Sequence, residues 1–235
     1  MANPPDRDVP SGPVAGDGMR LADTSRVEGF SDAVFAIVIT LLVLDLYDPD
    51  HGPGELVPGL AGKWPAYVAF LVSFVYVGVI WLNHHGLFRL IRRMDVGLLW
   101  INLAILFSAV IVPFPTAVLG DAFGDAGNPH DQRVAVVLYA LVAAVMSAPW
   151  WGVFGYLCDH PELLEPGVSP RYLRSQRTRP LTGLVLYVVC GIGGWFIAPV
   201  VGVVCIAVVI VYHGLTSEGL HEGPLGRLFG AARRR

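Results

Sequence analysis

Long apolar runs separated by short polar segments divide this chain. The runs cover residues 26–47, 65–86, 96–119, 132–156, 180–197 and 199–215. A helix needs about 20 apolar residues to cross the hydrocarbon of a membrane, so the first four runs are long enough and the last two are short for a crossing. Proline is disfavoured inside a helix, so Pro199 favours two helices over a single long one. The pattern predicts an all-α integral membrane protein with six transmembrane helices.

The composition agrees with a membrane protein. Hydrophobic residues make up 54% of the 235 residues and charged residues 15%, whereas soluble domains average about 25% charged residues. The net charge is −3, and the basic residues are scattered over separate loops, which argues against a nucleic-acid partner. The three cysteines have no metal-type spacing and are expected to be core residues.

Two polar tails flank the apolar part of the chain. Residues 1–24 are rich in Pro, Gly and Asp and lack the apolar core of a cleavable signal, so we expect a disordered cytoplasmic tail. Residues 25–215 form the six-helix unit, and residues 216–235 form a basic cytoplasmic tail.

The arginines and lysines predict the orientation. Fourteen of the 16 lie in residues 1–26, in the C-terminal tail and in the 87–95 and 157–179 loops, and only Lys63 and Arg133 lie in the intervening loops. Loops rich in Lys and Arg stay on the cytoplasmic side of a membrane. The distribution predicts an even number of spans, both termini in the cytoplasm and a location in the cell membrane.

The first run carries an acid just inside its first end. Asp32 follows Phe30 and Ser31, and a carboxylate at membrane depth costs about 2.5 to 3.5 kcal/mol. Such a group can have a specific partner or function inside the membrane. Alternatively, Asp32 and Ser31 only cap the helix at the level of the lipid headgroups. Position alone does not decide between these readings.

A helical wheel gives the first run two faces. At 100° per residue, Ile37, Leu41 and Leu44 fall within about 60° of one another. Phe30 and Asp48 lie on the same stripe at its inner and outer ends, and Asp32 points roughly 120 to 140° away from Ile37. Periodicity alone would assign the aliphatic stripe to ordinary helix or lipid packing.

Further polar groups lie at the same membrane face as Asp32. They end the second run and open the third: Trp81, Asn83, His84, His85 and Asn102. Indole, imidazole and amide groups can donate hydrogen bonds to a buried carboxylate or hydroxyl. The sequence therefore predicts a polar network that ties three helices together.

The sequence lacks the residues that several other functions require. His84 and His85 are adjacent, with no metal-binding residue four positions on, so no metal site is expected there. The acidic segment of Asp45, Asp48 and Asp50 does not fit a calcium-binding loop and is typical of a solvated rim. Nucleophile triads, phosphate-binding loops and a TVGYG potassium filter are missing, so we expect neither an enzyme nor a cofactor.

Three segments together resemble a known family. The first is Arg26-x3-Phe30-Ser31-Asp32, the second is Trp81-x2-His84-His85, and the third runs from Asn102 to Pro113-Phe-Pro-Thr116. This combination resembles the prokaryotic branch of the transmembrane protein 175 family, whose animal members are endosomal and lysosomal potassium channels. The resemblance covers roughly residues 20 to 215.

The resemblance implies a homotetramer around a pore that the first helix lines. It implies that aliphatic side chains form the constriction, at Ile37, Leu41 and Leu44, with Ile37 narrowest and Thr40 beside it. Potassium would permeate, with modest preference over sodium, and Asp45 and Asp48 would lie at the outer mouth. The remaining signature residues would hold the first helix in place: Arg26, Phe30, Ser31, Asp32, Trp81, His84, His85 and Asn102.

Two other functions stay open. A proton-coupled secondary transporter would use Asp32 as its titrating group in a water-filled cavity. A non-conducting membrane scaffold would use the aliphatic stripe only for packing.

Overall fold

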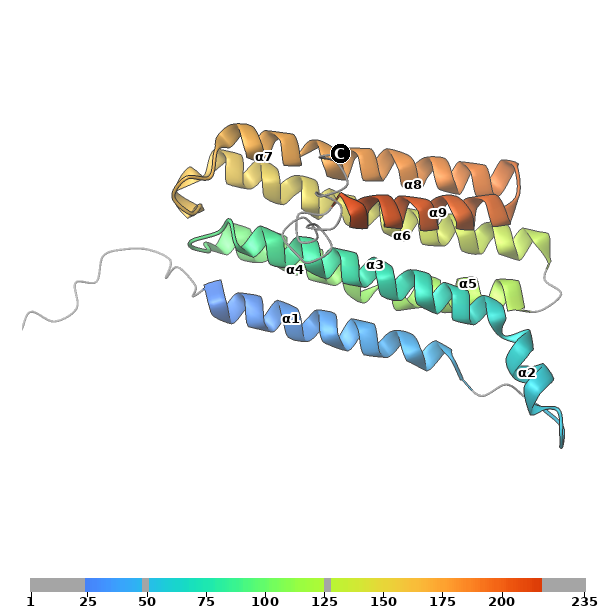
Figure 1. The fold of residues 1–235 in the computed structure, drawn as a ribbon. Coiled ribbons are helices and arrows are strands. Elements are labelled where there is room, and N and C mark those ends of the chain that lie inside the picture. The colour runs from blue at the N-terminus through green and yellow to red at the C-terminus, as the bar shows by residue number, and fades with distance from the viewer. Residues whose placement is uncertain (1–23, 48–50, 125–127, 217–235) are drawn as a thin grey trace, which may run out of the picture.

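The structure is a computed structural model that describes residues 24–47, 51–124 and 128–216. Over these ranges the regular elements are helices, and one isolated bridge joins Ile91 to Leu164. Figure 1 shows the long helices side by side in an elongated bundle, with α2 standing off one end. The elements are α1 (Thr24–Leu41), η1 (Leu42–Asp45), α2 (Leu56–Gly62), α3 (Trp64–Phe88), α4 (Val96–Val110), α5 (Pro113–Gly124), α6 (Pro129–Asp159), η2 (Pro161–Leu163), α7 (Pro170–Gln176), α8 (Thr178–Phe196) and α9 (Pro199–Leu215).

Five segments of the described chain are long and apolar enough to cross a membrane. They are α1 with η1, α3, α4 with α5, α6, and α7 with α8. The sixth predicted span, α9, has 17 residues and is therefore about 25 Å long. The predicted all-α, multi-pass membrane fold is confirmed, while a sixth crossing by α9 stays a prediction.

The first helix ends earlier than the sequence predicted. Instead of reaching residue 47, α1 stops at Leu41 and continues as the 3₁₀ turn η1. The amide of Leu46 closes this turn by donating to the carbonyl of Val43, because the last carbonyls of a helix have no partner within it. Side chains three apart eclipse in a 3₁₀ helix, so Leu44 lies above Leu41. Asp48, predicted to continue the stripe, lies outside the described residues.

The third predicted helix, 96–119, is broken in two. Asp95 caps α4 by accepting from the amide of Leu98 at 2.8 Å, and α4 ends at Val110. Pro113 then opens α5, since proline has no amide hydrogen and clashes with the preceding turn. Proline is disfavoured inside a helix, yet α6 continues through Pro149 to Asp159.

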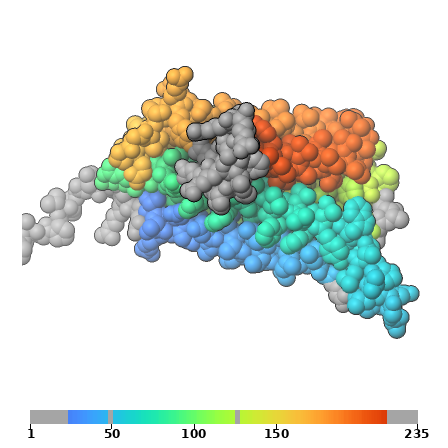
Figure 2. All heavy atoms as spheres, viewed as in Figure 1, coloured from blue at the N-terminus to red at the C-terminus, as the bar shows by residue number. Residues whose placement is uncertain are grey.

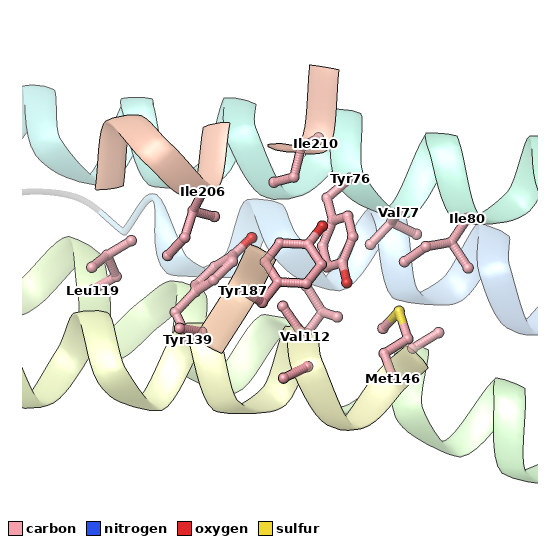
Figure 3. Close-up of a cluster of buried hydrophobic side chains, with 14 of the residues drawn as sticks. Tyr76, Val77, Ile80, Val112, Leu119, Tyr139, Met146, Tyr187, Ile206 and Ile210 are labelled. Carbon is pink, nitrogen blue, oxygen red and sulfur yellow. The ribbon is translucent and has the colours of Figure 1, made fainter. Parts of the chain in front are cut away.

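The bundle leaves α1 on its edge. The central helix α6 packs against α4, α5, α8 and α9, whereas α1 packs on α3 and α4 (Figure 1). Figure 3 shows the core around Tyr76, Tyr139 and Tyr187, which come from α3, α6 and α8. Only 22% of the apolar window of α1 is buried, against 39% of that of α3. Most of the apolar surface of the first helix is therefore not covered by the other helices of the same chain.

Close packing at the turn between α8 and α9 gives a first testable prediction. A Cβ atom on Gly202 would lie 2.5 Å from Val136 Cγ1 and 2.8 Å from the Cα atom of Gly194. Backbone cannot yield as a flexible side chain can, so Gly202→Ala should destabilise the fold by about 1–3 kcal/mol. Thermal unfolding of the detergent-solubilised protein should show a lower Tm.

The matched control is Gly193→Ala in the same turn. A Cβ atom there meets nothing within 4 Å, and alanine favours the helix by about 1 kcal/mol over glycine. Its Tm should not fall. Equal Tm values for the two variants would show that Gly202 is not needed for close approach.

Candidate functional site: the first helix and its polar anchor

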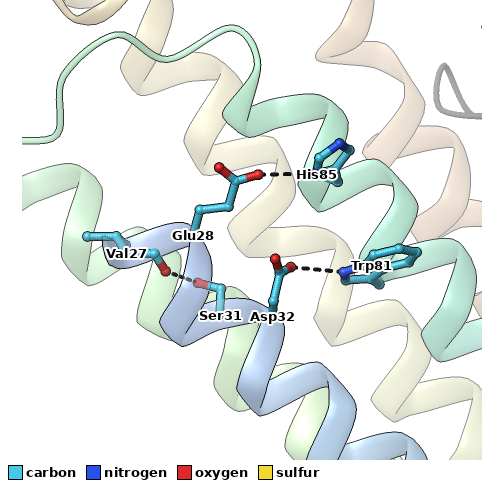
Figure 4. A network of polar contacts seen from close by, with 6 residues as sticks. All are labelled: Val27, Glu28, Ser31, Asp32, Trp81 and His85. Carbon is cyan, nitrogen blue, oxygen red and sulfur yellow. Dashed lines mark hydrogen bonds and ion pairs between the residues drawn. The ribbon is translucent and has the colours of Figure 1, made fainter. Parts of the chain in front are cut away.

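Asp32 is held by the neighbouring helix α3. Its Oδ1 atom accepts a hydrogen bond of 2.9 Å from the indole Nε1 of Trp81, as Figure 4 shows. One turn earlier on α1, Glu28 Oε1 lies 3.1 Å from Nδ1 of His85. Glu28 and Asp32 are four residues apart, as are Trp81 and His85, so each pair lies on one helix face. The two contacts form a ladder of two rungs between α1 and α3.

Ser31 starts a second set of contacts, directed into the bundle. Its hydroxyl donates to the carbonyl of Val27 at 2.9 Å and accepts from Nδ2 of Asn102 on α4 at 3.1 Å. The Oδ1 atom of Asn102 lies 2.8 Å from Nε2 of His84 on α3. An amide oxygen only accepts, so Nε2 of His84 carries the hydrogen. This chain of hydrogen bonds joins α1, α3 and α4, the three helices that the sequence suggested.

His84 and His85 have different surroundings. His84 is fully buried, with its ring against Phe35 and Phe88 at centroid distances of 5.1 and 4.6 Å. Its Nδ1 atom is buried and has no hydrogen-bond partner among the described residues. His85 is half exposed and stacks on Trp81. The inner chain thus uses His84, and the outer ladder uses His85.

Two of the predicted signature residues lie outside these contacts. Arg26 is exposed, and over the described ranges it has no hydrogen bond to Trp81, His84, His85 or Asn102. Phe30 is also exposed and points about 100° away from Ser31 around the axis of α1. Glu28, which sequence reasoning missed, takes part instead. Its position one helical turn before Asp32 is the signal that could have revealed it.

The opposite face of α1 is aliphatic and open. The exposed fractions of Ile37, Leu41 and Leu44 are 58%, 39% and 67%, although Val38 and Leu42 beside them are buried. The hydroxyl of Thr40 donates to the carbonyl of Ile37 at 2.8 Å and so has its partner within the helix. Figure 2 shows α1 along one outer edge of the molecule. We call Ile37, Leu41 and Leu44 the aliphatic stripe.

Small residues lie beside the aliphatic stripe. Gly29, Ala33, Ala36 and Thr40 are all exposed. At 100° per residue they fall on one side of the stripe, within about 60° of one another. Small side chains let two helix backbones approach closely in a membrane. This face of α1 is therefore shaped for contact with another helix.

The outer end of α1 carries one described acid of the predicted mouth. Asp45 closes η1, and its Oδ2 atom is buried without a hydrogen-bond partner among the described residues. Asp121 on α5 lies within electrostatic reach of this carboxylate. Over the part of the chain that the structure describes, no three His, Cys, Asp or Glu side chains converge as metal ligands would.

Asn102 gives a second prediction, because it bridges two buried groups. In Asn102→Leu, the Nε2 hydrogen of His84 and the Ser31 hydroxyl each lose their partner on α4. The Ser31 hydroxyl keeps its hydrogen bond to Val27, but the buried N–H of His84 is left unsatisfied. An unsatisfied buried donor costs about 1–3 kcal/mol, so the variant should unfold at a clearly lower temperature than the parent. Circular dichroism of the protein in detergent during heating would measure it.

Asn83→Leu serves as its control. The Asn83 amide donates to Val79 within its own helix, at 2.9 Å, so among the described residues its loss leaves no buried partner on another helix. A drop in Tm as large for this variant as for Asn102→Leu would contradict a bridging role for Asn102.

Comparisons with known proteins all find similarity to one family of channels. The family model described as "Endosomal/lysosomal potassium channel TMEM175" matches residues 26–113, from α1 to the start of α5. A potassium channel of Streptomyces collinus is 38% identical over 166 residues, which cover 70% of this chain and 79% of the relative. The endosomal/lysosomal proton channel TMEM175 of Homo sapiens is 34% identical over 61% of this chain, but this match spans only 30% of the human protein.

A solved structure extends the likeness to the fold. It is the crystal structure of a lysosomal potassium-selective channel TMEM175 homolog from Chamaesiphon minutus. It superposes with a TM-score of 0.71 at 33% sequence identity, covering 83% of this chain and 98% of that one. The similarity therefore covers the bundle as a whole and is not confined to the first two helices.

Proposed function

Because this chain belongs to the TMEM175 family, we propose that it is a potassium-permeable cation channel whose pore is lined by α1. The relatives from Streptomyces collinus and Chamaesiphon minutus are named as potassium channels. A family likeness suggests the permeating ion, but the site must account for how an ion passes. That account starts from the two faces of α1.

The exposed aliphatic stripe is the observation that carries this proposal. Two rungs to α3 and the Ser31–Asn102 contact fix the rotation of α1 about its axis. With that rotation, Ile37, Leu41 and Leu44 point away from the bundle. A lipid-facing helix needs no such polar anchor, whereas a pore helix needs a fixed rotation, since a turn of 100° would replace the lining.

Assembly supplies the rest of the pore. One α1 cannot enclose a path, so we propose four copies around a common axis, each with its aliphatic stripe toward that axis. The small residues Gly29, Ala33 and Ala36 would face the neighbouring α1 and let the four backbones come close. The partner of this chain is then a further copy of itself, within the lipid bilayer.

Aliphatic side chains select ions by the cost of water loss. A ring of four Ile37 side chains offers no oxygen ligands, and a narrow apolar constriction closes by dewetting. Potassium sheds its hydration water more readily than sodium, so the preference favours potassium but is modest. Leu41 and Leu44, eclipsed by the 3₁₀ turn, form two further rings on the outer side. Thr40 adds a hydroxyl beside the narrowest ring.

The charged residues suggest which end of the pore faces outward and which faces the cytoplasm. Asp45 and Asp48 would lie at the outer mouth and raise the local concentration of cations. The basic loops, including Arg89, Arg92 and Arg93, would lie in the cytoplasm with both termini. The protein would then be a multi-pass component of the cell membrane.

The other two functions find less support. A transporter that titrates Asp32 requires this carboxylate to face a water-filled cavity, yet its Oδ1 atom is bound to the indole of Trp81. A scaffold has no use for an aliphatic stripe whose rotation is fixed by polar contacts.

Ion flux from liposomes that hold the purified protein tests the proposal. Potassium flux should exceed sodium flux, and proton flux should be measured in parallel because the human relative is named as a proton channel. Empty liposomes provide the baseline. Flux of none of the three ions above this baseline would overturn the channel proposal.

A further inference from the structure

A cavity of about 120 Å³ lies inside the bundle, away from α1. Its walls come from α3, α6, α7, α8 and α9, in the half of the bundle where α3 ends and α8 begins. An apolar cavity of about 150 Å³ holds a molecule of benzene. This one is not fully enclosed, so it can take part of a longer molecule that extends out of it.

One wall of the cavity is apolar. Val79, Ile80, Leu87, Met146 and Phe154 line it, and all five are buried. Ligand cavities in proteins are mostly lined by such side chains, with a few polar groups that fix the orientation of the ligand. This wall suits an alkyl chain.

Another part of the lining is polar. Tyr187, 2% exposed, has a buried hydroxyl with no hydrogen-bond partner among the described residues. Ser147 and His213 both lie next to Gly183: a Cβ atom on Gly183 would lie 2.9 Å from His213 Nε2 and 3.4 Å from Ser147 Oγ. Burying an unsatisfied hydroxyl is unfavourable, and a ligand that bonds to it would recover that free energy.

A positively charged side chain, Arg179, belongs to the same polar wall. Arg179, Gly183 and Tyr187 follow one another at four-residue spacing and so lie on one face of α8. The guanidinium of Arg179 donates to Gln176 Oε1 and to the carbonyl of Thr216, which fixes it between α7 and the end of α9. Among the described residues that line the cavity, none is Asp or Glu. The polar wall is therefore suited to an anion.

We propose that this cavity binds an anionic amphiphile, with part of its alkyl chain against α3 and α6 and its head on the polar wall, which is formed by Arg179, Tyr187, Ser147 and His213. The head is a carboxylate or a phosphate, from a free fatty acid or from a membrane phospholipid. Binding at this site does not depend on whether the protein conducts ions.

Photolabelling with a decanoate that carries a diazirine tests this site. The full-length protein is placed in nanodiscs of phosphatidylcholine, illuminated, and digested for mass spectrometry. Labelled peptides should contain cavity residues of α6, α8 or α9. Excess decanoate should remove the label, whereas decanol, with the same chain and no charge, should not.

Two variants separate the site from non-specific labelling. Arg179→Gln should lower the label about tenfold, because a charge-assisted contact is lost, while Arg174→Gln, an exposed arginine outside the cavity, should leave it unchanged. Tyr187→Phe keeps the shape of the wall and should also lower the label without lowering Tm. Equal labelling of all variants, or equal competition by decanol, would overturn the proposal.

A lipid arm identifies the source of the head group. If phosphatidylglycerol in the nanodisc reduces the label, the natural occupant is a phospholipid; if it does not, the occupant is a free fatty acid. Labels confined to the exposed faces of α4 and α8 in both nanodiscs would count against any anionic amphiphile in this cavity.

Discussion

Replacing Ile37 with asparagine is expected to raise the sodium permeability of the reconstituted protein and to lower its preference for potassium. The 58% exposed side chain of Ile37 belongs to the proposed constriction, where four copies exclude water. An amide in each copy supplies hydrogen-bond partners to water and so wets the ring. The selectivity ratio should fall about tenfold, which corresponds to about 1.4 kcal/mol. Bilayer recordings with potassium on one side and sodium on the other measure the ratio.

An isoleucine of similar exposure on α8 provides the control. Ile192 is 53% exposed, and its helix α8 runs on the opposite side of the bundle from α1 (Figure 1). Ile192→Asn introduces the same amide into the same hydrocarbon, but away from the proposed axis, and should leave the ratio unchanged. If Ile37→Asn conducts with the parental ratio, Ile37 is not the selective layer.

Replacing Ala33 with tryptophan is expected to abolish assembly and, with it, ion flux. Ala33 is exposed on the small-residue side of α1, where the proposed tetramer brings neighbouring backbones together. An indole there would separate the four helices by more than the contact allows. Light scattering of the detergent-solubilised variant should give the mass of a single chain where the parent gives four, and liposomes should show no flux above baseline.

Ala148→Trp tests whether any added indole has this effect. Ala148 is exposed on α6, outside the proposed interface, so the variant should keep the parental mass and flux. A parent that is itself a single chain would remove the basis of the pore. A tetrameric Ala33→Trp would instead show that the copies meet through another face.

Much of the fold followed from hydropathy, because each crossing must be about 20 apolar residues long whatever its neighbours are. The break before Pro113 was harder to predict. Pro113, Pro115 and Pro149 all lie in apolar runs, yet α6 continues through Pro149 while α4 stops at Val110. Prolines in membrane helices are tolerated when neighbours satisfy the freed backbone groups. That depends on packing, which sequence spacing does not contain.

Some features of the candidate site could likewise be predicted from the sequence, and others could not. Position along the helices predicted that Asp32, Trp81 and Asn102 lie at one membrane face. In a chain that crosses the membrane back and forth, the start of α1, the end of α3 and the start of α4 lie on the same side. Sequence could not assign His84 and His85 to their partners, since adjacent residues point about 100° apart and only the tilt of α3 decides which is buried. The end of α1 as a 3₁₀ turn was missed because helix termini depend on local hydrogen bonds.

The anchor of α1 also has a consequence for biosynthesis. Ser31 and Asn102 are 71 residues apart, and Asp32 and Trp81 are 49 apart. A ribosome that adds about 5–20 residues per second needs about 4–14 s to make the first of these intervals. While the 49 residues up to Trp81 are made, the Asp32 carboxylate lacks its partner, and until all 71 residues up to Asn102 are made, the Ser31 hydroxyl lacks its partner on α4. The first helix is therefore synthesised first but cannot complete its docking before α4 has been made.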